Sequence, residues 1–266
     1  LNMIDKLKEF WSKYIPYKLH PDDENYLGIS KSKYCLELSI NQLRNRYGND
    51  LKSDRVNESF ASNKSNRKKI MSNIFAIPFL GDVENARVYI LMGNPGFETG
   101  DYVDEIENAN YIQLLKNNIN LKSKNFICLE DMAINTGGYK YWYDNRRMLK
   151  ILKLLDNMNN LTTQENFKYL KNSICIIQSV AYHSCKKPDE ELYNLPSSLF
   201  TKKLVNEYVQ KKIEQKDSLC FVWRSSAFWN LRETENLIER SPKKAQLAGF
   251  INDEAPLIAN FINSKI

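Results

Sequence analysis

Short apolar runs alternate with longer amphipathic stretches over most of the chain. The apolar runs occupy residues 88–92, 125–130, 172–182 and 217–223, and a last short strand is expected at 235–239. Stretches between them, such as 144–158 and 198–216, carry apolar residues three and four positions apart, which is typical of helices. Apolar runs bounded by turns are typical of strands buried on both faces of a parallel sheet. The pattern predicts a three-layer α/β/α fold around a mostly parallel sheet of four to five strands.

The N-terminal part of the chain has a different pattern. Residues 3–17 and 34–47 carry apolar side chains at helical spacing. The polar, serine-rich stretch that follows contains a group of cations: Lys64, Arg67, Lys68 and Lys69. This group is either a solvated surface or a patch that contacts phosphates. We expect an N-terminal helical extension over residues 1–77 and one α/β domain over residues 78–266.

Composition narrows the functional classes. The 266 residues include 38 Lys and Arg against 32 Asp and Glu, a formal charge of +6, which permits a polyanionic partner without requiring one. The sequence has no apolar run near the roughly 20 residues that a membrane helix needs and no signal-like start, so we expect a cytoplasmic protein. Five dispersed cysteines and two histidines predict reduced thiols and no zinc site. No cofactor is expected.

Small and polar residues follow the predicted strands, at the edge where open α/β sheets bind ligands. Residues 93–97 read G-N-P-G-F after the first strand. Gln178 lies in the run at 172–182, and His183 directly follows that run. Basic residues begin the loops after the last two strands: Arg224 and Arg240. The glycine spacing matches neither G-x-G-x-x-G nor a P-loop, so the sequence does not predict those nucleotide sites.

The turn after the first strand resembles a known motif. Residues 92–96 read M-G-N-P-G, and this turn resembles the first motif of the uracil-DNA glycosylase superfamily, which reads G-I-N-P-G in the mismatch-specific branch. Residues 174–184 are similar to the family's middle strand. The resemblance covers roughly residues 78–262. It implies a monofunctional DNA glycosylase, which extrudes a base from duplex DNA and hydrolyses its N-glycosidic bond.

A later segment departs from the family pattern. Residues 240–250 lie where the family has a His-Pro-Ser-type loop followed by a helix. Here Arg240 stands in place of that histidine, and Ser241 precedes the proline instead of following it. A departure of the base assisted by that histidine is therefore not implied for this chain.

The resemblance implies roles for the residues at the predicted edge. Asn94 would hold the water that adds at C1′ of the sugar, and His183 is a second catalytic candidate. Four residues would surround the extruded base: Gly93, Gly96, Phe97 and Gln178. The Phe97 ring would stack on the base, and the Gln178 amide offers both a donor and an acceptor to a pyrimidine edge.

Each of these residues also has a purely structural interpretation. Asn94 could satisfy the backbone of its own turn. Phe97 could be an ordinary core aromatic, and His183 could bond a neighbouring loop. The sequence alone leaves both interpretations open.

Two segments are candidates for contact with DNA. Tyr141, Trp142 and Arg146 belong to an aromatic and arginine-rich stretch that could stack on bases and neutralise phosphates, or cap the surface of the core. Backbone contacts are expected from Arg224, Arg240, Ser241, Lys243 and Lys244. Gln246 could fill the space that the extruded base leaves. Alternatively, the two lysines only keep the surface soluble.

Gly96 bears on the substrate. The uracil-specific branch of the family has a tyrosine here that blocks substituents at the pyrimidine C5, and Gly96 leaves that side open. The implied substrate is a 5-substituted pyrimidine in duplex DNA, including hypermodified cytosine of phage DNA in an antiviral role, with the protein acting as a monomer. The alternatives are a uracil or mismatch repair glycosylase, a non-catalytic DNA-binding module, and a hydrolase of free nucleotides.

Overall fold

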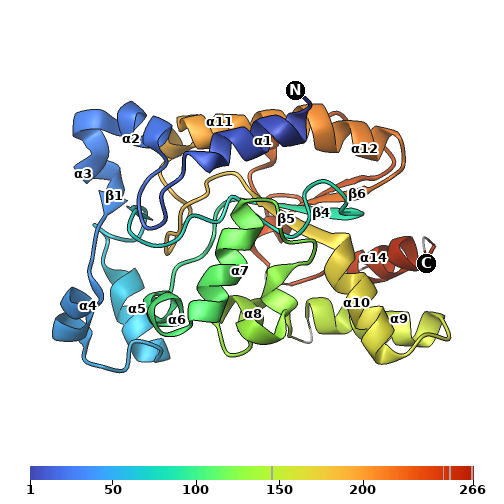
Figure 1. The fold of residues 1–266 in the computed structure, drawn as a ribbon, viewed down its shortest axis with the longest axis horizontal. Helices are drawn as coiled ribbons and strands as arrows, with labels where there is room; N and C mark the ends of the chain where they lie inside the picture. The colour runs from blue at the N-terminus through green and yellow to red at the C-terminus, as the bar shows by residue number, and fades with distance from the viewer. Residues whose placement is uncertain (145, 248, 252, 265) are drawn as a thin grey trace.

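A five-stranded sheet forms the centre of the protein (Figure 1). The computed structural model describes residues 1–144, 146–247, 249–251, 253–264 and 266. The strands are β3 (Phe79–Leu80), β4 (Val88–Met92), β5 (Ile174–Gln178), β6 (Leu219–Val222) and β7 (Leu237–Glu239), in the spatial order β3-β5-β4-β6-β7. β4 to β7 are parallel, and β3 pairs antiparallel with β5. The predicted mostly parallel α/β sheet is confirmed.

Helices cover both faces of this sheet, which explains why every residue of β4, β5 and β6 is buried. Figure 1 shows α1 (Met3–Ser12), α11 (Pro196–Leu204) and α12 (Gln210–Glu214) above the sheet. Below it are α7 (Ala109–Ile119), α8 (Gly137–Trp142), α9 (Met148–Met158), α10 (Thr163–Ser173) and α14 (Glu254–Asn263). The three predicted layers are therefore present.

The remaining helices and strands are short or lie in the N-terminal part. They are α2 (Pro21–Leu27), α3 (Lys31–Tyr34), β1 (Cys35–Leu36), α4 (Ile40–Tyr47), α5 (Asp54–Ser62), β2 (Ile70–Met71), α6 (Thr99–Glu107) and α13 (Ser226–Trp229). The predicted helix at 34–47 begins only at Ile40, because Ser39 caps it and residues 35–36 pair with β2 instead. Short 3-10 helices connect several of these elements, among them η4 (Glu190–Asn194) and η6 (Lys244–Gln246).

The strand predicted at 125–130 is wrong. Residues Ile127–Leu129 form a 3-10 helix, η2, and Phe126 to Leu129 are all buried. A short apolar run is equally compatible with a buried helical turn, and periodicity cannot separate the two. The segment is apolar because it is buried, not because it pairs with another strand.

The N-terminal residues share their packing with the α/β part. Leu7, Trp11 and Tyr14 belong to the same buried cluster as β4 and β5. A second cluster, which includes Leu43 and Phe60, is completed by side chains from the β4–α6 region. Residues 1–77 therefore contribute to both hydrophobic cores.

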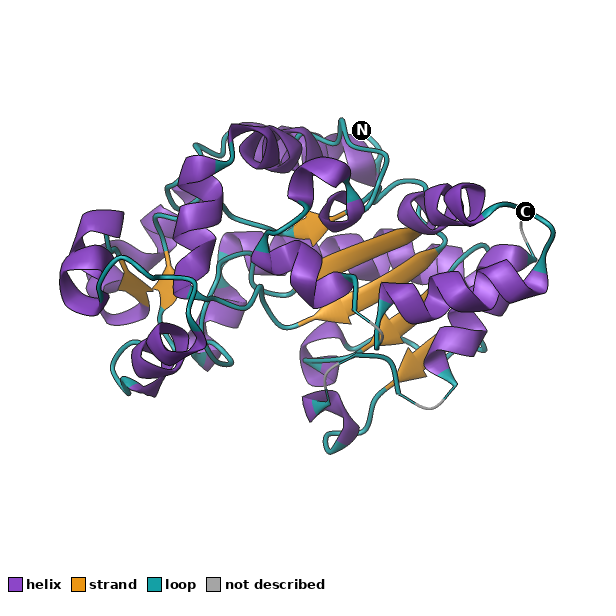
Figure 2. Ribbon diagram, turned by 90° about the horizontal axis from the view of Figure 1, so that it is seen from below, coloured by secondary structure: helices purple, strands orange, loops and turns teal. Residues whose placement is uncertain are grey.

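The parallel strands point toward the end of the molecule that holds the β1–β2 pair (Figure 2). The loops that follow β4, β5, β6 and β7 consequently lie along one edge of the sheet. Among the described residues, no helix is long and apolar enough to cross a membrane.

Candidate functional site

The strand order of the sheet changes direction at β4. The chain passes from β4 to β5 on one side and later to β6 on the other, which is the switch point where open α/β sheets bind ligands. A Cβ on Gly93 would lie 3.5 Å from the Ser225 hydroxyl and 4.0 Å from the Tyr193 hydroxyl. These two hydroxyls are 3.1 Å apart. Gly93 therefore lies in close, polar surroundings next to the predicted catalytic turn.

Asn94, half-buried in this turn, has a fixed side-chain orientation. Its Nδ2 donates to the Pro95 carbonyl at 2.6 Å and to the Ser184 hydroxyl at 2.9 Å. Because a carbonyl can only accept, the contact with Pro95 identifies which end of the amide is the nitrogen. None of the residues that the structure describes donates to Oδ1. The amide is thus held by its nitrogen and leaves its oxygen available as an acceptor.

The turn after β4 is tied to the segment after β5. Besides the Asn94 contact, the Ser184 N–H donates to the Pro95 carbonyl at 3.2 Å, and His183 Nδ1 lies 2.6 Å from the Gly96 carbonyl. Gly96 and Ser184 also form an isolated parallel bridge. These contacts stabilise the turn. His183 therefore helps to hold the turn in position through its hydrogen bond to Gly96.

The environment of His183 keeps its ring uncharged at neutral pH. Burial lowers its pKa from 6.5 to about 4, against the opposing effect of the Gly96 and Phe75 carbonyls. The Asp101 carboxyl lies 3.8 Å from Nδ1, and burial raises its pKa to about 8. Both groups are therefore mostly neutral at pH 7, and Nδ1 carries the hydrogen donated to Gly96.

The lowered pKa of His183 should affect how the free energy of unfolding depends on pH. The unfolded chain protonates this histidine near pH 6.5 but the folded chain only near pH 4, so the contribution of His183 to the free energy of unfolding falls as the pH drops across that window, whereas the raised pKa values of Asp101 and Glu105 contribute with the opposite sign. His183→Asn keeps a donor for Gly96 and removes the titration. In urea titrations from pH 7 to 4, the free energy of unfolding of the variant should increase relative to that of the wild type by up to about 1.4 kcal/mol per pH unit as the pH falls. Equal pH slopes for the variant and the wild type would contradict the lowered pKa of His183.

A row of side chains crosses the carboxyl edge on one face of the sheet. Met92 pairs with Gln178 at the end of β5, and Trp223 comes directly after β6. Gln178 Oε1 and Trp223 Nε1 are buried and have no hydrogen-bond partner among the described residues. Such an unpaired group costs about 1–3 kcal/mol. An acceptor and a donor left unpaired at this edge are compatible with recognition of a ligand that has both kinds of group.

Phe97 does not fit its expected stacking role. Its ring is buried in the second cluster, with its centroid 5.2 Å from that of Phe60 and 5.7 Å from that of Tyr102. The alternative interpretation as a core aromatic explains the residue. Phe97 anchors the N-terminal part to the turn that contains Asn94.

Arg240 is not a surface contact for DNA, contrary to expectation. Its guanidinium is buried and forms a two-point ion pair with Glu254, with Nε–Oε1 2.8 Å and NH2–Oε2 2.6 Å. It also donates to the Leu247 and Gly249 carbonyls, and its Cζ lies 3.9 Å from the centroid of the Trp223 ring. Because these groups occupy the guanidinium, Arg240 organises the loop that follows it.

The aromatic stretch divides into core and surface residues. Trp142 is buried, and its ring stacks on that of Trp223 with centroids 6.1 Å apart, so the expected contact with DNA does not fit it. Tyr141 is 38% exposed, and the Arg147 guanidinium lies 3.8 Å from its ring centroid. Arg146 is exposed. Only Tyr141 and Arg146 of this group remain candidates.

The other predicted DNA contacts are on the surface. The exposed residues are Arg224, Ser241, Lys243, Lys244 and Gln246. Lys244 and Gln246 lie in η6. Since β6 and β7 are parallel to β4, these loops follow the same edge of the sheet as Asn94.

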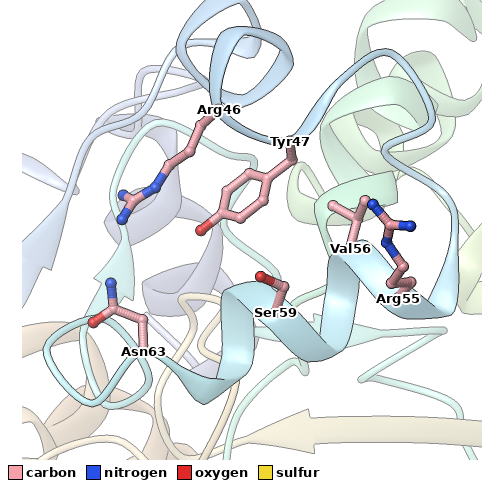
Figure 3. A pocket seen from close by; sticks show the side chains of 6 residues that line it. All are labelled: Arg46, Tyr47, Arg55, Val56, Ser59 and Asn63. Atoms are coloured by element: carbon pink, nitrogen blue, oxygen red, sulfur yellow. The ribbon is translucent and has the colours of Figure 1, made fainter.

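Two pockets of the described structure are lined by residues other than Asn94, Gln178 and Trp223. One, of about 350 Å³, lies between α4 and α5 and is lined by Arg46, Tyr47, Arg55, Val56, Ser59 and Asn63 (Figure 3). Another, of about 260 Å³, is lined by residues that include Lys52, Asp104 and Glu107. Within the described ranges, no group of three or more His, Cys, Asp and Glu side chains could hold a metal ion.

Several contributors to the site were not predicted. Ser184 follows His183, and its position beyond β5 places it at the candidate edge of the sheet. Its hydrogen bond to Asn94 depends on tertiary structure and could not be predicted. Tyr193 comes from η4 and carries no local signal at all. Comparisons of the chain with protein-family models, with curated proteins and with solved structures gave no match.

Proposed function

We propose that the protein is a monofunctional DNA glycosylase that acts on a modified pyrimidine in duplex DNA, as a cytoplasmic monomer. The observation that supports this most is the Asn94 amide at the switch point of the sheet. Its nitrogen is fixed by Pro95 and Ser184, and its oxygen is available to accept a hydrogen bond from a water. The resemblance to the glycosylase turn implies that this water is the one that adds to the sugar.

In this proposal, Asn94 Oδ1 holds a water at C1′ of the extruded nucleotide. An amide is too weak a base to remove the proton fully, so the bond to the base breaks early and the water adds late. Positive charge develops on the sugar and negative charge on the base. The Gln178 amide reads the polar edge of the base, and His183 fixes the turn by its bond to Gly96.

Gly96 leaves room for a substituent at the pyrimidine C5. The residue is exposed, and a Cβ added to it would meet nothing within 4 Å. Gly96→Tyr should therefore fold normally and introduce a steric barrier on that side. We expect excision of a 5-substituted pyrimidine to fall about 10-fold or more, with excision of the unsubstituted base changed less. Parallel loss on both substrates would place Gly96 away from C5.

The proposed activity can be tested with a panel of duplexes. The panel carries uracil, mismatched thymine, 5-hydroxymethylcytosine and glucosylated 5-hydroxymethylcytosine at one position. Alkali then cleaves the strand wherever a base has been removed. Excision of only the bases that carry a large 5-substituent supports an antiviral role. Excision of uracil or mismatched thymine supports repair. Binding without cleavage on any duplex would favour a non-catalytic DNA-binding module.

Lys243 and Lys244 are expected to contact the DNA backbone beside the site. Both side chains are exposed in the loop after β7. Replacing both by Gln should weaken binding to all sequences alike and make the slope of log affinity against log salt shallower by roughly 1–2. Fluorescence anisotropy over a KCl series measures both quantities. Unchanged affinity and slope would leave the lysines a solubilising role, and a hydrolase of free nucleotides would show no steep slope.

A further inference from the structure

A second group of cations lies outside the proposed site. Between residues 59 and 81 the chain has no Asp or Glu and four basic residues: Lys64, Arg67, Lys68 and Lys69. Lys64, Arg67 and Lys68 are exposed, and none of them pairs with an acidic side chain of the described residues. Lys69 differs, because its Nζ donates to the Ser32 carbonyl at 2.7 Å. The segment therefore presents unneutralised positive charge.

Hydrogen bonds connect this segment to the loop that holds Asn94. The Lys186 N–H donates to the Arg67 carbonyl at 2.9 Å, and the Lys186 carbonyl accepts from the Ser184 hydroxyl at 2.6 Å. The same hydroxyl accepts from Asn94. Lys186 is itself exposed and adds a fourth cation. Lys64, Arg67, Lys68 and Lys186 form what we call the basic strip, directly beside the proposed catalytic turn.

The pocket between α4 and α5 lies at the other end of the strip. The Asn63 carbonyl accepts from the Arg67 N–H at 3.2 Å, and the Asn63 side chain lines the pocket. Figure 3 shows the Arg46 guanidinium and the Tyr47 hydroxyl on the same side of this pocket as Asn63. The lining contains no acidic residue. Guanidinium, hydroxyl and amide donors together suit a phosphate group.

The basic strip and the lysines after β7 lie on opposite sides of β4. The strip adjoins the loop after β5, on one side of β4, whereas Lys243 and Lys244 follow β7 on the other side. Asn94 thus lies between two separate groups of cations. A nucleotide extruded from duplex DNA requires the backbone to be held on both sides of it.

We propose that the basic strip binds the phosphate backbone of duplex DNA on one side of the extruded nucleotide, and that the pocket between α4 and α5 receives a phosphate further along the strand. The inference rests on the proposed function, because Asn94 defines where the nucleotide is extruded. It gives residues 1–77, which lie outside the family resemblance, a role in engaging the substrate.

The test compares two triple variants that remove the same charge. The first is Lys64→Gln, Arg67→Gln and Lys68→Gln; the control is Lys6→Gln, Lys8→Gln and Lys13→Gln, whose exposed side chains lie on or just after α1. Affinity for a plain duplex without a modified base is measured by anisotropy over a KCl series. The strip variant should bind about 10-fold or more weakly at 0.1 M KCl, with the salt slope reduced by roughly 2–3, and the control should change much less. Arg46→Gln alone should reduce the slope by roughly 1.

The outcomes separate this inference from the proposed activity. A plain duplex offers no base to excise, so its binding is independent of catalysis. A strip variant as tight and as salt-dependent as the control would overturn the inference, even where the wild type excises bases. Weak binding by the strip variant with no excision by the wild type would support the strip and overturn the glycosylase activity. A wild type that binds no duplex would overturn both.

Discussion

Asn94→Ala is expected to lower single-turnover base excision by about 100-fold or more, with little change in DNA affinity. The side chain holds a water in the proposed mechanism but contributes no charge to backbone binding. Its removal also breaks the bonds to Pro95 and Ser184. Rates are measured with enzyme in excess, and affinities by anisotropy on the same duplex.

Ser184→Ala is the matched control for Asn94→Ala. It removes one of the two acceptors that orient the amide and leaves the water-holding oxygen in place. We expect a loss of about 10-fold or less, because the Pro95 carbonyl still fixes the amide. An Asn94→Ala protein with the unfolding midpoint and the excision rate of the wild type would move the catalytic group elsewhere.

Arg240→Met is expected to lower the free energy of unfolding by about 3–5 kcal/mol. The substitution retains apolar contact with Trp223 but leaves the Glu254 carboxylate buried without its cation. It also leaves the Leu247 and Gly249 carbonyls without a donor. Urea unfolding at neutral pH measures the difference, and the measurement does not depend on DNA.

Two further variants complete this test. Replacing both partners, as Arg240→Met with Glu254→Leu, should recover much of the lost stability, because no buried charge remains unpaired. Lys243→Met, at an exposed position three residues along, should change the free energy of unfolding by about 0.5 kcal/mol or less. A loss below about 1 kcal/mol for Arg240→Met would contradict the interior position of the guanidinium.

The sheet was predictable from the sequence where strands are buried on both faces. β4 and β6 are apolar throughout, and β5 is apolar up to its last residue, Gln178. The run at 125–130 has the same composition but forms η2. The two-residue strand β3 carries too little pattern to be recognised. Only the tertiary pairing decides these two cases.

The arrangement of the candidate site was predictable at the level of loops but not of side chains. The rule that ligands bind at strand ends placed Asn94 and Gln178 at one edge. The burial of Arg240 depends on Glu254, 14 residues further along. That of Phe97 depends on Phe60, in a different part of the fold. No local pattern reveals such partners, so an arginine and an aromatic residue beside a predicted site resemble functional groups when they are structural.

Analysis of the reaction products in H₂¹⁸O most directly tests the claim that Asn94 directs water to C1′. A duplex that the wild type cleaves in the panel assay is incubated in labelled water and examined by mass spectrometry. The proposed mechanism predicts a free base that carries no ¹⁸O, because the water adds to the sugar and not to the base, and an abasic strand that is trapped by reduction. It also predicts that both products are about 100-fold less abundant with Asn94→Ala at early times. Release of a nucleotide instead of a base, or equal release by the variant, would contradict the mechanism.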